Sequence, residues 1–136
     1  APGVTQDTRI AIAAGLVPLF SEVIAPRCPQ SLGHRSEDGG PLALTAYMFF
    51  DLIWIDPPGF PPEALALDAA MIEAMGAILA LPHAACQEAA LHGLGHWHDR
   101  APGRASALID DYLAGNRAAR PELVDYARAA RTGCVL

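Results

Sequence analysis

The sequence contains no lysine, so its nine basic residues are all arginines. Charged residues make up only 18% of the 136 residues, and the acidic excess gives a formal net charge of −6. No run of basic residues occurs, which argues against a nucleic-acid partner or an anionic membrane surface. The lack of lysine beside abundant alanine, arginine, glycine and proline is typical of a GC-rich bacterial source.

Cysteine is also scarce. With three cysteines, Cys28, Cys86 and Cys134, at least one thiol is unpaired in the monomer. This pattern does not indicate a disulfide framework and favours a reducing compartment, so we expect a cytoplasmic protein. Cys86 is expected to be a packed thiol, and Cys28, in the motif RCPQ, to be more accessible to chemistry.

Long uncharged apolar runs are absent as well. The most apolar stretches are 42–55 and 64–81, and acidic residues interrupt both of them. Neither provides the roughly 20 apolar residues that a transmembrane helix requires. The sequence therefore predicts no membrane span.

What the chain does contain is a series of helical patterns separated by loops rich in proline and glycine. Pro18 is expected to kink or divide the first helix. Apolar residues on two sides of the third helix place it at the centre of the fold. No alternating strand pattern competes, so the sequence predicts one all-α domain over 1–136, an antiparallel array of about six helices. The predicted helices cover 5–24, 42–55, 63–81, 84–98, 104–116 and 121–132.

The last four helices, over 62–132, resemble HEAT-like helical repeats, in which helix pairs stack into an α-α superhelix. The resemblance lies in helix length and in the stretches RASALIDDYL (104–113) and ELVDYARAA (122–130). The stretches YMFFDLIW (47–54) and CQEAALHGLGH (86–96) resemble a bacterial family of such proteins. This resemblance implies a short HEAT-like superhelix. The resemblance implies nothing about activity. By analogy with such helical stacks, which usually offer extended surfaces, we expect a non-enzymatic module that binds a protein or small ligand. The richness in apolar residues makes self-association a further expectation.

The stretch LHGLGHWHDR (91–100) holds three histidines within seven residues. On a helix, His92 and His96 lie one turn apart on one face and could hold one metal ion. Asp51, in an otherwise apolar segment, is the first candidate for a third ligand. Glu88 shares the histidine stripe but lies roughly 12 Å from His96 along the helix axis, too far to join it. Further candidate ligands are Cys28, His34, His83 and His98.

The same stretch has a structural interpretation, which we favour on the sequence alone. Gly93 lies on a strip of small residues with Cys86, Ala89 and Ala90, where another helix can approach closely. The histidines would then tie helices together through hydrogen bonds, with no metal or other cofactor. A separate interpretation is a ligand pocket, and the tentative ligand-binding face of a binding module then comprises Asp51, His92, His96, Trp97 and His98.

The alternative is a small enzyme, zinc-dependent or acid–base, that uses Asp51, His92 and His96. It predicts that the three side chains converge in an open pocket. A binding module predicts instead that they are sealed between helices or spread over a surface. The sequence leaves open whether the protein is an enzyme.

Overall fold

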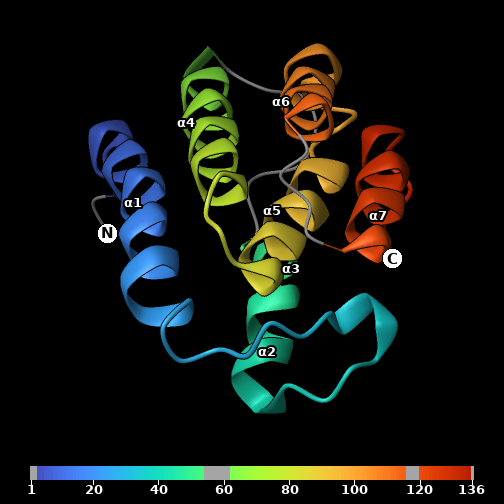
Figure 1. Ribbon diagram of the computed structural model, residues 1–136. Helices are drawn as coiled ribbons and strands as arrows, with labels where there is room; N and C mark the ends of the chain where they lie inside the picture. The colour runs from blue at the N-terminus through green and yellow to red at the C-terminus, as the bar shows by residue number, and fades with distance from the viewer. Residues whose placement is uncertain (1–2, 54–61, 116–119, 136) are drawn as a thin grey trace.

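The computed structural model describes residues 3–53, 62–115 and 120–135, which form helices and loops without any strand (Figure 1). The all-α prediction is confirmed. A six-residue π-helix and a short 3-10 turn, Gly33–Arg35, accompany the α-helices of this part of the chain. The helices are α1 (Gln6–Pro18), the π-helix (Leu19–Ile24), α2 (Gly40–Tyr47), α3 (Phe49–Leu52), α4 (Pro62–Leu79), α5 (Ala84–His96), α6 (Pro102–Ala114) and α7 (Pro121–Arg131).

Helix α5 is the centre of the fold. All its residues from Ala84 to Gly95 are buried. Helices α4 and α7 flank it, α2 and α3 pack against it, α1 covers α4, and α6 packs on α7 (Figure 1). The helix predicted over 63–81, here α4, packs between α1 and α5, so it is covered on two sides as predicted, but α5 is the most deeply buried helix.

Buried polar residues explain why the central position of α5 could not be predicted from the sequence. Gln87, for example, is only 5% exposed. Its amide donates to the Leu81 carbonyl at 2.8 Å and its side-chain oxygen accepts from the Tyr112 hydroxyl at 3.0 Å. A polar group that finds such partners can be buried at little cost, so polarity alone does not mark an exposed face.

Pro18 divides the first helix, as predicted. Helix α1 ends at Pro18, and the chain continues as the π-helix with Phe20 and Ile24 buried. Proline has no N–H to donate and its ring clashes with the carbonyl four residues earlier. The wider π turn is a common local response to such a disrupted hydrogen-bond ladder.

The single helix predicted over 42–55 is broken at Met48, whose φ of −88° and ψ of 5° lie outside helical geometry. After the break, Phe50 stacks on Phe20 in the core with ring centroids 5.9 Å apart. Asp51 of the short helix α3 then reaches the side of α5. The last two residues of that prediction, 54 and 55, lie outside the described residues.

Candidate metal centre

Three side chains from two helices meet beside α5. Nε2 of His92 lies 2.9 Å from Oδ2 of Asp51, and Nε2 of His96 lies 2.5 Å from Oδ1 of the same carboxylate. The two Nε2 atoms are 3.0 Å apart. The structure thus brings together the three residues that the sequence analysis singled out for the enzyme alternative.

These three contacts cannot all be hydrogen bonds in the neutral histidines. A neutral imidazole carries one N–H, and an ionised carboxylate only accepts. If each histidine donates its Nε2–H to Asp51, no lone pair remains on either nitrogen for the contact between His92 and His96. A shared cation satisfies all three contacts at once, because two imidazole lone pairs and a carboxylate oxygen can point to it together.

The spacing of the ligand atoms also suits a metal ion. Two atoms each about 2.1 Å from one zinc ion lie about 3 Å apart at a right angle and about 3.4 Å apart at a tetrahedral angle. The separations of 3.0 Å between the two histidine nitrogens and 2.9 Å between His92 Nε2 and Asp51 Oδ2 are close to the lower end of this range. The 2.5 Å separation of His96 Nε2 and Asp51 Oδ1 would have to lengthen by about 0.5 Å for both atoms to bind one ion. All the candidate ligand atoms lie within 4.8 Å of one another.

The cluster is buried at one end and accessible at the other. The side chain of His92 is 1% exposed, that of Asp51 24% and that of His96 42%. Burial lowers the pKa of His92, although the hydrogen bond with Asp51 opposes this shift. His92 is therefore mainly neutral at pH 7, which is the form that binds a metal.

Helix α7 supplies a partner for the second ring nitrogen of His92. The hydroxyl oxygen of Tyr126 lies 2.7 Å from His92 Nδ1. Burial raises the pKa of Tyr126, so its hydroxyl stays protonated. The Tyr47 ring also packs against the His92 ring, with centroids 4.8 Å apart. Metal-bound histidines commonly have such a partner on the nitrogen that does not bind the metal.

A second polar cluster supports Tyr126. The Glu88 carboxylate accepts hydrogen bonds from the backbone N–H groups of Gly33 and His34, both at 2.8 Å. It also contacts His34 Nδ1 at 2.5 Å. The His34 ring stacks on the Tyr126 ring with centroids 4.2 Å apart. Glu88 thus stays apart from His96, as its position along the helix predicted, and instead fixes the loop before α2 against α5.

The other tentative site residues lie outside the three-residue cluster. Trp97 is buried, and the Arg100 guanidinium sits over its ring at 4.7 Å from the centroid. Nδ1 of His98 lies 3.3 Å from Oδ1 of Asp99, and its ring packs beside Gly133. Of the five residues of the predicted ligand-binding face, only Asp51, His92 and His96 converge.

The further candidate ligands are engaged elsewhere. Nε2 of His83 bonds to the backbone carbonyl of Cys28 at 2.8 Å, while its Nδ1 accepts from the Cys86 N–H at the start of α5. His34 is held by Glu88. These contacts have a structural role, because they join the segment after the π-helix to the N-terminal end of α5.

Sequence reasoning missed Tyr126 and Tyr47. Tyr126 occupies an interior helical position beside Leu123, Ala127 and Ala130, and its partner His92 is 34 residues away. The one available signal is chemical: a buried phenol hydroxyl needs a hydrogen-bond partner. Which partner it finds depends on how α7 packs against α5.

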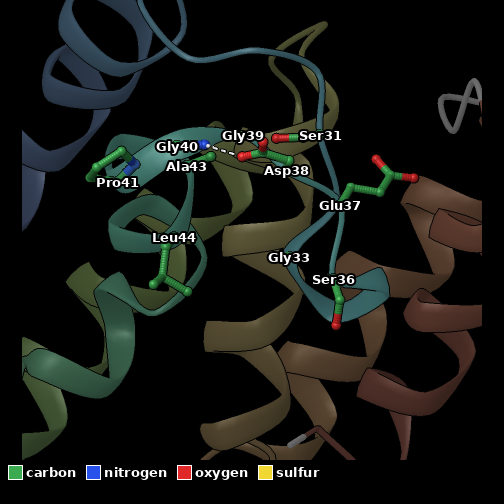
Figure 2. Close-up of a pocket in the computed structure, with 10 residues that line it drawn as sticks. All are labelled: Ser31, Gly33, Ser36, Glu37, Asp38, Gly39, Gly40, Pro41, Ala43 and Leu44. Atoms are coloured by element: carbon green, nitrogen blue, oxygen red, sulfur yellow. Dashed lines mark hydrogen bonds between the residues drawn. The ribbon is translucent and has the colours of Figure 1, made fainter.

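A separate cavity of about 490 Å³ lies in the segment that leads into α2 (Figure 2). Asp38 turns toward the backbone there and accepts from the Gly40 N–H at 3.2 Å. The Ser31 hydroxyl has no partner among the described residues, but it is buried against Gly39 and out of reach of solvent. None of the cluster residues takes part. The cavity is lined by Ser31, Gly33, Ser36, Glu37, Asp38, Gly39, Gly40, Pro41, Ala43 and Leu44.

The three thiols should differ in reactivity. Burial raises the pKa of Cys86 to about 12, and burial followed by the nearby Glu88 charge raises that of Cys28. Cys28 is buried, so the expectation that it is accessible was wrong, whereas Cys134 is exposed. A chromogenic disulfide reagent at mildly alkaline pH is expected to modify Cys134 quickly and the other two only after denaturation. Fast reaction of two thiols in the native protein would contradict the burial of Cys28.

Comparisons of the chain with protein-family models, curated proteins and solved structures found no match. No helix within the described ranges is long and apolar enough to cross a membrane. A functional conclusion must therefore come from the chemistry of the site itself.

Proposed function

We propose that this protein binds a divalent transition-metal ion, zinc in the first instance, through Asp51, His92 and His96. The observation that carries the proposal is the convergence of two Nε2 atoms 3.0 Å apart on one carboxylate. Two histidines and a carboxylate form the ligand set of one group of catalytic zinc sites and of non-haem iron(II) sites.

The three ligands found among the described residues point to a catalytic rather than a structural site. Structural zinc ions take four protein ligands, whereas catalytic ones take three and keep a position for water. The 42% exposure of His96 gives solvent a route to that position. A zinc-bound water ionises near pH 7 and becomes a strong nucleophile, so hydrolysis is the reaction class we propose. The Asp51 oxygen that does not bind the metal can accept the proton of that water.

Metal binding to protein purified without metal tests the proposal. We expect one zinc ion per chain by elemental analysis and by competition with a chromophoric chelator. Asp51→Asn and His96→Ala should each weaken binding by about 100-fold or more, because each removes a ligand. Matched controls lie next to the cluster: Asp99→Asn and His98→Ala remove the same groups outside it and should leave affinity unchanged.

Stability gives a second measurement. A ligand that binds only the folded state at 100 times its dissociation constant stabilises that state by about 2.7 kcal/mol. Zinc should therefore raise the melting temperature of the parent protein and of the two controls, but not that of Asp51→Asn. Failure of the parent to bind zinc, iron(II), cobalt(II) or manganese(II), or equal binding by Asp51→Asn, would overturn the proposal.

A further inference from the structure

We infer that Tyr126 is the positioning residue that lets His92 present Nε2 to the metal, and that its hydroxyl reverses its hydrogen bond when the metal binds. This inference rests on the proposed function. It concerns the interior side of the site, where the Tyr126 oxygen lies 2.7 Å from His92 Nδ1.

Without a metal, the two ring nitrogens of His92 have different hydrogen-bonding roles. Nε2 faces the Asp51 carboxylate at 2.9 Å, and a carboxylate can only accept. The neutral ring therefore carries its proton on Nε2. Nδ1 is then a lone-pair acceptor, and the Tyr126 hydroxyl donates to it.

A bound cation reverses this arrangement. The metal takes the Nε2 lone pair, so the Nε2 proton passes to solvent while Nδ1 takes up a proton, and the ring stays neutral. Nδ1–H now requires an acceptor in a buried position. The Tyr126 oxygen can serve, because a phenol both donates and accepts, and the neighbouring Tyr47 hydroxyl, with which Tyr126 already shares a hydrogen bond, can then accept the Tyr126 proton. A neighbour that only donates or only accepts could not satisfy both states.

The Tyr126 ring is held in place while its hydroxyl remains able to rotate. His34 stacks on the ring at an interplanar angle of 14° with centroids 4.2 Å apart. His34 is in turn fixed by the buried Glu88 carboxylate. Rotation about the C–O bond is then the motion that changes the direction of the hydrogen bond, and the oxygen stays within reach of His92.

A pair of phenylalanine variants tests the role of Tyr126. Tyr126→Phe removes the hydroxyl and keeps the ring that stacks on His34. Tyr112→Phe is the matched control, because its hydroxyl is equally buried and donates to Gln87 on another side of α5. Zinc affinity should fall about 10- to 100-fold in Tyr126→Phe, as for other outer partners of metal-bound histidines, and less than about 3-fold in Tyr112→Phe.

Nitrogen NMR of the parent protein tests the reversal without any variant. His92 should show a protonated Nε2 in the metal-free protein and a protonated Nδ1 after zinc is added. A metal-free protein with the proton on Nδ1 would overturn the reversal. Zinc binding of normal strength in Tyr126→Phe, or equal losses in both variants, would overturn the positioning role while the proposed function stands. Absence of zinc binding by the parent overturns the proposed function and, with it, this inference.

Discussion

Replacement of Glu88 by alanine is expected to lower the free energy of unfolding by about 2–5 kcal/mol, because two backbone N–H groups lose a carboxylate acceptor and each unsatisfied donor costs about 1–3 kcal/mol. Glu88 is 1% exposed, and its carboxylate accepts from the N–H groups of Gly33 and His34. Alanine leaves both of these partly buried donors without their acceptor. Denaturant unfolding measured by circular dichroism gives the change.

Two comparison variants separate this effect from general loss of a glutamate. Glu88→Gln keeps one acceptor oxygen and should fall between the parent and Glu88→Ala. Glu73→Ala makes the same truncation on the exposed face of α4, where the change should stay within about 0.5 kcal/mol. A cost below about 1 kcal/mol for Glu88→Ala would show that the loop before α2 does not depend on this carboxylate.

The helical fold could be predicted because its signals are local. Pro121 at the start of α7 and the break at Pro18 mark helix ends through properties of single residues. The break at Met48 could not be predicted, because it depends on Phe50 packing against Phe20 from a different helix. The central place of α5 was missed because it too depends on contacts between different helices.

The site was predictable in part. His92 and His96 follow from helical spacing, and Asp51 follows from the cost of a carboxylate among apolar neighbours. Their convergence depends on how α3 docks on α5, and the contribution of Tyr126 depends on α7. The resemblance to HEAT-like repeats and the expected interaction surface stay predictions, since both concern other proteins and partners rather than contacts within this chain.

The second large effect is expected for Gly93→Ala, at the point where α3 and α4 approach α5. A Cβ at this position would lie 2.6 Å from the Met75 sulfur and 2.8 Å from Cγ of the Phe50 ring. Both neighbours belong to the buried core, so they cannot move aside freely. The close-packing role predicted for Gly93 is confirmed by these distances.

We expect Gly93→Ala to destabilise the protein by about 1–2 kcal/mol, because an overpacking cost of up to about 3 kcal/mol outweighs the gain in helix propensity of roughly 1 kcal/mol. Gly15→Ala is the matched control in α1. Nothing lies within 4 Å of the added Cβ there, so this variant should be more stable than the parent by about 0.5–1 kcal/mol. Thermal and denaturant unfolding of both variants measure the difference, and equal stability of Gly93→Ala and the parent would contradict the close packing.

The same substitution should also weaken metal binding. Phe50 directly precedes Asp51 in α3, so a Cβ that displaces the Phe50 ring moves the carboxylate away from His92 and His96. Zinc affinity should therefore fall in Gly93→Ala and stay unchanged in Gly15→Ala. Gly93 allows α3 to lie close to α5. It thereby also allows Asp51 of α3 to complete the metal site with His92 and His96 of α5. On this view, the packing role and the metal role of LHGLGHWH are two consequences of one close contact between helices.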